Sequence, residues 1–242
     1  MIDRRRFLLA APVVLAACAE RPRPELAAPP PVDPYYASLY GPIDDGRFYI
    51  EALDMSVVDP RFLRREVAYD TREAPGTIVV DPTNHYLYLV REGGRAIRYG
   101  VGVGREGFRW NGVATVGRKA AWPTWTPPAA MLKRDPQARP WAKGMPGGPD
   151  NPLGARALYL YQGGRDTLYR IHGTNDPSTI GLSLSSGCIR LFNHDIIHLY
   201  NQTPVGTKVV VLKYAGPTLD GEIVDEAEPD GRRAAAAGAV LR

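Results

Sequence analysis

Short runs of β-branched and aromatic residues, separated by turn-forming sequences, are the feature that most constrains how this chain can fold. The runs lie at residues 77–81, 85–90, 96–103, 158–161, 169–172 and 207–212 of the 242-residue chain. Sequences such as Pro82-Thr83-Asn84 and Gly163-Gly164 lie between them and favour tight turns. Many short strands with regular turns predict a mainly β domain, an antiparallel sandwich or barrel-like fold. The alternating glycines Gly100 and Gly102 indicate a strand that other backbone approaches closely.

Two segments interrupt the β pattern. Residues 122–154 are rich in Trp, Pro and Gly and too long for an ordinary connection, which predicts a packed lid. For Trp122 and Trp125 we favour packing within this lid over a role as stacking platforms for sugars. Residues 193–200 predict a short helix with Asn193 as its N-cap, and a second short helix is expected to start at Asp59.

The N-terminal sequence is typical of an exported protein. A twin arginine within Arg4-Arg5-Arg6 precedes an apolar run at residues 7–17, which predicts a signal peptide over residues 1–18. Leu15-Ala16-Ala17-Cys18 resembles a lipobox, in which Cys18 is lipidated, whereas Ala17-Cys18-Ala19 fits ordinary signal peptidase, which would remove Cys18. The protein is therefore expected in the periplasm or cell envelope, and its membrane contact would come only through the lipid anchor that the lipobox alternative supplies.

The rest of the chain divides by composition. Residues 19–45 are rich in Pro and Ala and predict an extended spacer. Residues 46–75 are expected to be a pre-domain segment that wraps onto the domain at residues 76–214. Residues 215–242 are acidic and then alanine-rich, which predicts a disordered tail.

Charge and cysteine content exclude some classes of protein. The chain has 44% hydrophobic residues, 23% charged residues and a formal charge of +4, without the basic, aromatic-interleaved stripe typical of nucleic-acid binding. It has two cysteines, and export would remove or lipidate Cys18. Cys188 is then the single thiol of the mature domain, so no internal disulfide is expected. A small buried hydrophobe is the structural alternative for Cys188.

The segment from His172 to Leu191 contains the residues that predict chemistry. A cysteine nucleophile needs a histidine to accept its proton and backbone donors for the oxyanion. Cys188 and His172 supply the first two groups, and the amides of a tight turn at 185–188 are expected to supply the third. Gly173 is expected to leave space beside the histidine for a substrate. A nearby helix N-terminus would favour the thiolate of Cys188.

Two other histidine patterns have weaker interpretations. The sequence His194-Asp195-Ile196-Ile197-His198 superficially resembles a zinc-binding helix. We favour instead a helix with two solvent-facing histidines, because Ile196, Ile197 and Leu199 can form its core face. His85 is expected to be an ordinary edge residue of a strand next to a turn.

The pattern H-G-T-x(6)-G followed by S-x-G-C-I-R-L resembles the signature of the L,D-transpeptidases with a YkuD-type catalytic domain. The similarity covers about residues 76–214, and residues 147–154 (Gly-Gly-Pro-Asp-Asn-Pro-Leu-Gly) also resemble family sequence. The resemblance implies that Cys188 is the acylated nucleophile and His172 the proton donor and acceptor. The amides of Gly187 and Cys188 would line the oxyanion hole. Many relatives have histidine where this chain has Ser186, which leaves His172 as the only obvious base. Arg190 would shape or charge the substrate site, or anchor the turn through a salt bridge.

The resemblance also implies a reaction that needs no metal or cofactor. Cys188 would attack the carbonyl that joins meso-diaminopimelate to the terminal D-Ala of a peptidoglycan tetrapeptide stem, and a thioester would form. An amine would then resolve the thioester, either from another stem, giving a 3-3 cross-link, or from a lysine of an outer-membrane protein. Two alternatives remain: an L,D-carboxypeptidase-type hydrolase, in which water resolves the thioester, and a non-catalytic peptidoglycan-binding lipoprotein.

Overall fold

The computed structural model describes residues 33–104, 110–184 and 188–215. The predicted signal peptide, the two alternatives for Cys18, most of the predicted spacer and nearly all of the predicted tail lie outside these ranges. Within the described ranges, no helix has the length and apolar character that crossing a membrane requires.

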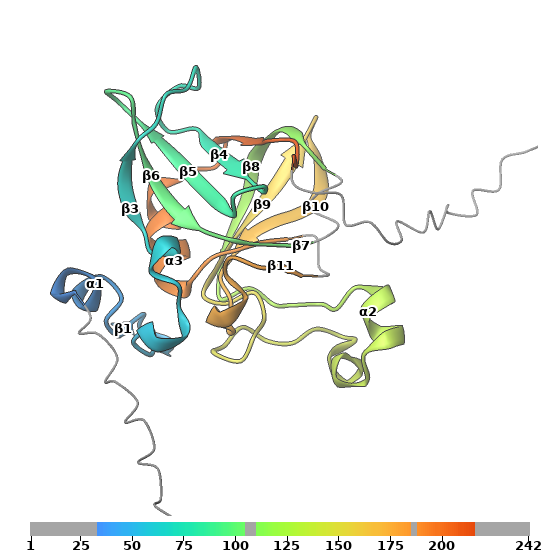
Figure 1. Cartoon of the computed structure of the whole chain (residues 1–242). Coiled ribbons are helices and arrows are strands. Elements are labelled where there is room, and N and C mark those ends of the chain that lie inside the picture. Colours follow the sequence, from blue (N-terminus) through green and yellow to red (C-terminus); the bar gives the residue numbers. More distant parts are fainter. Residues whose placement is uncertain (1–32, 105–109, 185–187, 216–242) are drawn as a thin grey trace, which may run out of the picture. The chain divides into compact units, whose positions relative to one another are not determined.

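Most of the described strands form one large mixed sheet (Figure 1). Its eleven described strands lie in the order β11-β7-β12-β10-β9-β8-β13-β4-β5-β6-β3, and β1 (Ile43–Asp44) and β2 (Tyr49–Ile50) form a separate pair. The strands of the large sheet are β3 (Arg65–Ala68), β4 (Ile78–Asp81), β5 (Tyr86–Arg91), β6 (Arg95–Gly100), β7 (Gly102–Gly104), β8 (Gly112–Ala121), β9 (Arg156–Gln162), β10 (Arg165–His172), β11 (Ser183–Leu184), β12 (Ile189–Arg190) and β13 (Lys208–Val211).

The predicted mainly β fold and its local hairpins are confirmed. Strands β4 and β5 pair antiparallel across the predicted turn at 82–84, and β9 and β10 pair across the predicted turn at 163–164. The sheet is mixed rather than wholly antiparallel, because β10–β12, β11–β7 and β13–β4 are parallel pairs. Each parallel pair joins segments that are distant in sequence, and local turn signals carry no information about such pairs.

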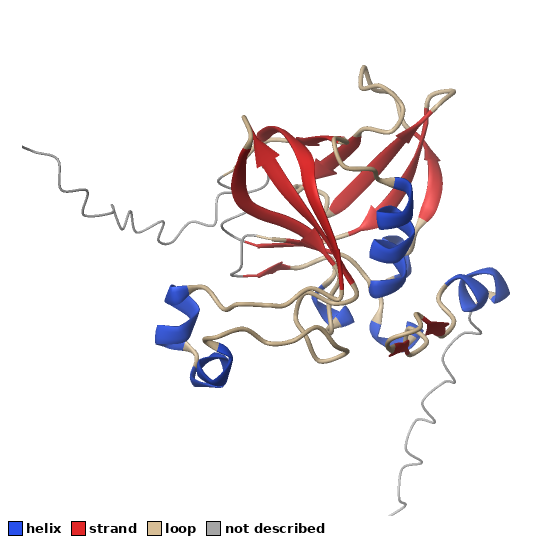
Figure 2. Ribbon diagram, turned by 180° about the vertical axis from the view of Figure 1, so that it is seen from behind, coloured by secondary structure: helices blue, strands red, loops and turns tan. Residues whose placement is uncertain are grey.

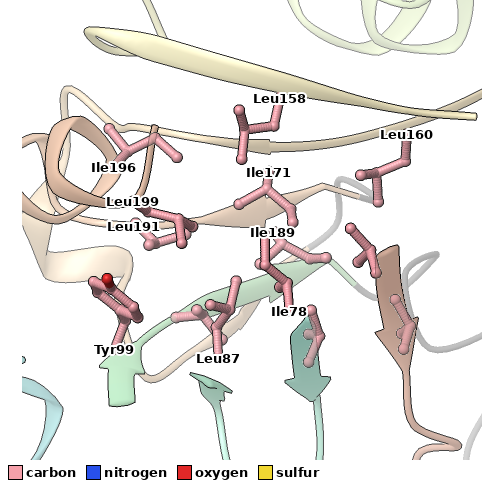
Figure 3. Packing of buried hydrophobic residues seen from close by; sticks show 14 of the residues in the cluster. Ile78, Leu87, Tyr99, Leu158, Leu160, Ile171, Ile189, Leu191, Ile196 and Leu199 are labelled. Atoms are coloured by element: carbon pink, nitrogen blue, oxygen red, sulfur yellow. The ribbon is translucent and has the colours of Figure 1, made fainter. Parts of the chain in front are cut away.

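The core lies where side chains from the two arms of the sheet meet. Leu158, Leu160 and Ile171 from β9 and β10 approach Ile78 and Leu87 from the opposite side of the cluster (Figure 3). All five are fully buried. At about 25 cal/mol per Å² of buried apolar surface, a cluster of this kind is the main source of the domain's stability. The core therefore fixes the positions of β10 and β12, which carry the candidate site.

Helix α3 (Asn193–Gln202) covers one side of this core (Figure 2). Its residues Ile196 and Leu199 are fully buried in the cluster, as the sequence predicted for the core face. The predicted N-cap is wrong: Phe192 occupies the cap position, and the side chain of Asn193 instead accepts a hydrogen bond from the amide of Ala155 at 2.9 Å. A long-range backbone donor has displaced the local capping interaction.

The short helices lie outside the sheet. They are α1 (Pro34–Leu39), η1 (Met55–Val57), η2 (Pro60–Phe62), α2 (Ala129–Arg134), η4 (Pro136–Trp141) and η5 (Pro177–Thr179). The helix expected at Asp59 is the single 3₁₀ turn η2, which Asp59 caps by accepting from the amide of Arg61. Helices α2 and η4 lie in the segment predicted to be a lid (Figure 1).

The N-terminal part of the described chain packs onto the domain. Tyr40, Phe62 and Leu63 form a buried cluster with Ile180 and Phe192. The predicted spacer over residues 19–45 therefore ends earlier than expected, because α1 and β1 lie within it. Proline at the first position of α1 starts the helix rather than extending the chain, since its ring fixes a helical φ.

A charged group from this segment joins it to the domain. Asp45 accepts two hydrogen bonds from the guanidinium of Arg156, at 2.6 and 2.7 Å, and one from the indole of Trp122 at 2.7 Å. The Asp45 and Arg156 side chains are only 15% and 11% exposed. The hydrogen bonds from Arg156 hold the pKa of Asp45 below its usual value.

Substituting Asp45→Asn is expected to destabilise the fold by about 2–4 kcal/mol, because the mostly buried guanidinium of Arg156 would lose its counter-ion. Urea denaturation at pH 7 measures this loss. Glu66→Gln is the matched control: Glu66 pairs with Arg95 at an exposed position, where a pair contributes less than about 1 kcal/mol. Equal losses in the two variants would contradict the assigned role of Asp45.

Candidate active site

The site begins with the parallel pairing of β10 and β12. Ile171 pairs with Ile189, and His172 pairs with Arg190. Ile171 and Ile189 both enter the buried core (Figure 3). Because successive side chains of a strand point to opposite faces, His172 and Arg190 lie together on the other face.

Cys188 lies directly before β12, two residues from Arg190. The two groups interact electrostatically, which places Cys188 near the guanidinium of Arg190. Its carbonyl accepts a hydrogen bond from the amide of Gly104 at 3.2 Å, which ties the backbone of Cys188 to β7. The side chain is half-buried. The fully buried alternative for this thiol is therefore wrong.

Other expectations around Cys188 have different outcomes. Helix α3 begins only at Asn193, after β12, so Cys188 does not lie at its N-terminus as the sequence predicted. Ser186 and Gly187 lie outside the described residues. The expected role of the Gly187 and Cys188 amides as oxyanion donors thus stays a prediction.

The hydrogen bond of His172 determines which ring nitrogen carries the proton. Nδ1 lies 2.6 Å from the carbonyl oxygen of Gly173. A carbonyl oxygen only accepts, so Nδ1 is the protonated nitrogen and Nε2 keeps its lone pair. A neutral imidazole in this tautomer can accept a proton at Nε2, which is the task of a general base.

The surroundings of His172 keep the ring neutral. Only 4% of the residue is exposed, and this burial lowers the pKa of His172 to about 4. The hydrogen bond to Gly173 opposes the shift, while the charges of Arg190 and Arg170 add to it. At neutral pH the ring is therefore neutral, with its proton on Nδ1 and none on Nε2.

We expect the imidazole of His172 to titrate near pH 4 rather than near 6.5, and an NMR titration of its ring resonances measures this midpoint. Because the folded-state pKa lies below the unfolded one, His172 stabilises the fold above pH 6.5. That contribution is lost as pH falls from 6.5 to about 4. The spectrum of a denatured sample, titrating near 6.5, is the control. A folded-state midpoint of 6 or above would contradict the burial argument.

Gly173 is in close contact with the start of α3. A Cβ at this position would lie 2.2 Å from Oδ1 of Asn193 and 3.1 Å from the amide nitrogen of Ala155. The space that the sequence analysis assigned to a substrate is thus filled by Asn193. Close packing accounts for the glycine, and it fixes the carbonyl that holds Nδ1 of His172.

The base of the lid is organised by a residue that the sequence analysis did not single out. Asn151 is fully buried, and its amide nitrogen donates to the carbonyls of Pro123, Met145 and Pro146 at 2.9–3.2 Å. Its side-chain oxygen accepts from the amide of Leu153. Asn151 lies among prolines and glycines in residues 147–154, where the backbone forms no regular secondary structure. Carbonyls in such a segment need other hydrogen-bond donors, and an asparagine side chain there is a signal that it supplies them.

Trp122 is packed, as predicted, whereas the side chain of Trp125 is only partly buried. Trp122 is 7% exposed, packs edge-on against Phe48, and donates its indole hydrogen to Asp45. Trp125 joins the two arms of the lid through paired backbone hydrogen bonds with Met145, at 2.9 and 2.7 Å.

The remaining histidines have separate partners. His194 is buried and donates to the carbonyl of Gly41, and Nδ1 of His198 lies 2.7 Å from the hydroxyl of Tyr99. The prediction of two solvent-facing histidines is therefore wrong, and the two rings are held apart from any shared ligand position by these contacts. His85 lies in the turn before β5 with φ 58°, not in a strand, and its Nε2 is 2.9 Å from Oγ of Ser183.

Arg190 is the last predicted residue of the site. It is 8% exposed, and its guanidinium lies over Gly102, its pairing partner on β7. Among the described residues, no carboxylate lies within salt-bridge distance of it, so the anchoring salt bridge is absent there.

Comparisons with known proteins identify the family of this domain. Residues 75–211 match the model of the YkuD family, the L,D-transpeptidase catalytic domain. The probable L,D-transpeptidase YbiS of Escherichia coli K12 is 41% identical over 162 residues, which cover 64% of this chain and 48% of YbiS. The probable L,D-transpeptidase ErfK/SrfK of the same strain is 39% identical over 158 residues, covering 64% and 47%. The chain thus spans about half the length of these curated relatives.

One solved structure has higher identity. It is described as a probable carnitine operon oxidoreductase from Brucella melitensis, is 49% identical, and has a TM-score of 0.45, covering 64% of this chain and 96% of that one. The family model covers more than half of the chain, and the matched residues include His172 and Cys188. The chain therefore belongs to the L,D-transpeptidase family, through a YkuD-type catalytic domain.

Proposed function

We propose that this protein is a peptidoglycan L,D-transpeptidase with Cys188 as its nucleophile and His172 as its base. The substrate would be a tetrapeptide stem that ends in meso-diaminopimelate and D-Ala. The proposal is supported chiefly by the Nδ1-protonated, neutral ring of His172 on β10 and by the half-buried thiol of Cys188 directly before β12, the strand that pairs with β10. Membership of the family supports the choice of substrate.

In the acylation step, Nε2 of His172 takes the thiol proton and Sγ attacks the carbonyl carbon between meso-diaminopimelate and D-Ala. The negative charge on the carbonyl oxygen would be stabilised by backbone amides, for which Gly187 and Cys188 are the candidates. The C–N bond then breaks, and D-Ala leaves as an amine that has received the proton from His172. A thioester on Cys188 remains.

In the second step an amine attacks the thioester carbonyl, and Nε2 of His172 accepts a proton from that amine. The C–S bond breaks, a new amide forms, and the thiolate recovers its proton. The acceptor would be the free amine of another stem, giving a 3-3 cross-link, or a lysine of an envelope protein. Water in the same position would give the L,D-carboxypeptidase reaction.

The proposed location is the periplasm or cell envelope, where such stems occur. The predicted signal peptide at residues 1–18 supports this location. A lipid on Cys18 would tether the domain to a membrane, with the proline-rich residues after it as a spacer.

The test is to incubate the full chain with a defined tetrapeptide stem and three acceptors in turn: a second stem, a lysine peptide, and buffer alone. Mass spectrometry of the products identifies the reaction. We expect release of D-Ala with formation of a new amide when an amine is present. Release of D-Ala without any amide product would make the protein a carboxypeptidase, and no release by folded, reduced protein would contradict the enzymatic proposal.

A further inference from the structure

Two of the three guanidinium nitrogens of Arg190 are buried without an acceptor in the described part of the chain. The residue is 8% exposed, and neither Nε nor Nη2 has a hydrogen-bond partner there. A guanidinium stays charged at every relevant pH, and burying a charge without an acceptor is costly. Such a group calls for a ligand that supplies the missing acceptors.

The fold places this guanidinium close to the proposed nucleophile. Cys188 lies directly before β12 and two residues from Arg190, which is about 6.6 Å in extended backbone. It pairs with His172 on one side and with Gly102 on the other. A Cβ on Gly102 would lie 3.0 and 3.1 Å from Nη2 and Nε of Arg190, so the glycine makes room for the guanidinium over β7.

Asp176, whose carboxylate attracts Arg190 electrostatically, is hydrogen-bonded to other groups. Asp176 attracts the guanidinium, but its Oδ1 accepts from the amide of Ser178 at 3.1 Å and from Oγ of Ser178 at 2.6 Å. Burial lowers the pKa of Arg190, while the negative charges of Cys188 and Asp176 oppose this shift. Asp176 thus adds charge at a distance without forming a salt bridge to Arg190.

We propose that Arg190 binds the terminal carboxylate of the donor peptide and so restricts the enzyme to the last peptide bond of a stem. This inference rests on the proposed function. In such a substrate, the carboxylate carbon lies three bonds beyond the attacked carbonyl carbon, within one residue of Sγ. The planar fork of a guanidinium matches a carboxylate, and charged hydrogen bonds of this kind are strong. A stem extended by one residue has no carboxylate at that point.

The experiment uses the full chain with Cys188→Ala, which binds a donor without reacting. Calorimetric titration compares three peptides: the tetrapeptide acid, its C-terminal carboxamide, and a tetrapeptide whose diaminopimelate side-chain carboxylate is amidated. We expect the C-terminal carboxamide to bind about tenfold to a hundredfold more weakly than the acid. We expect the peptide with the amidated side chain to bind like the acid.

Adding Arg190→Gln should abolish the preference for the acid and leave binding of the carboxamide unchanged. Arg190→Lys keeps the positive charge but loses the planar guanidinium, so it should retain part of the preference for the acid. Arg170→Gln is the matched control: Arg170 lies two residues before His172, but its guanidinium is already bonded to both oxygens of Asp166, so the preference should persist. Circular dichroism verifies that each variant is folded.

Equal binding of acid and carboxamide by the Cys188→Ala chain would overturn the proposal, as would binding of neither peptide. The proposal would also be overturned if amidating the diaminopimelate side-chain carboxylate weakened binding and amidating the terminal carboxylate did not. The proposed function is tested separately by D-Ala release from the unmodified chain. A chain that prefers the acid but releases no D-Ala would retain this inference and contradict the reaction.

Discussion

Cys188→Ala is expected to lower the rate of D-Ala release by about 10⁶-fold, to the background of the assay, because the covalent intermediate cannot form without Sγ. Losses of this size are typical when the nucleophile of a covalent mechanism is removed. The measurement is the steady-state rate with a defined tetrapeptide stem. Binding of the stem should change little, since the substitution removes one atom from a half-buried position.

Cys188→Ser is the matched control for that result. It keeps the size and position of the side chain but replaces the thiol by a much weaker nucleophile, because a serine hydroxyl at this position has only the neutral His172 to activate it. We expect it to be nearly as inactive as the alanine variant, with the same folded stability. Substantial activity in either variant would show that another group carries the reaction.

His172→Gln is expected to reduce the acylation rate by about 10³-fold, within the range that general-base catalysis contributes. Glutamine offers polar atoms but cannot take the thiol proton at Nε2. The reaction should then require hydroxide, so the rate of the variant should rise continuously with pH. The unmodified chain should instead lose activity only as pH falls through about 4, where His172 is protonated.

The pH profile distinguishes a base from a structural residue. A variant that is merely misfolded would lose activity by the same factor at every pH and would show a lower unfolding temperature. A folded His172→Gln variant with the pH profile of the unmodified chain, only scaled down, would contradict the role assigned to His172.

Local sequence patterns were sufficient for the parts of the fold that depend on neighbouring residues. The hairpins β4–β5 and β9–β10 follow from alternation of residue types and the turn sequences between them. The core face of α3 follows from the spacing of Ile196 and Leu199. Glycine at position 102 correctly indicated a close approach, which proved to be that of Arg190 and the carbonyl of Thr179.

Tertiary contacts determined what the local patterns missed. The parallel pairing of β10 with β12 connects segments separated by the loop after His172, and no turn signal encodes it. Asn193 is of a residue type that commonly caps helices, but its side chain accepts a hydrogen bond from the amide of Ala155 instead. His194 has the residue type of a surface histidine, yet Gly41 from the N-terminal segment covers it. Each error comes from a partner distant in sequence.

In the candidate site, too, some features follow from local sequence and others only from tertiary contacts. Residue types and the motif suffice to propose Cys188 and His172, because a thiol and an imidazole are the groups that the proposed chemistry needs. The tautomer and low pKa of His172 depend on burial and on the carbonyl of Gly173, which only the folded chain defines. The burial of Nε and Nη2 of Arg190, which have no hydrogen-bond partner among the described residues, likewise comes from packing over Gly102.

The most direct test of the central claim is to identify the acylated residue. Rapid acid quenching of the full chain mixed with a tetrapeptide stem, followed by proteolysis and peptide mass spectrometry, locates the adduct. We predict a mass increase equal to the stem minus D-Ala on the peptide that contains Cys188, removed by hydroxylamine and absent from Cys188→Ala. An adduct on another residue, or turnover with no adduct while Cys188→Ala remains active, would contradict the account.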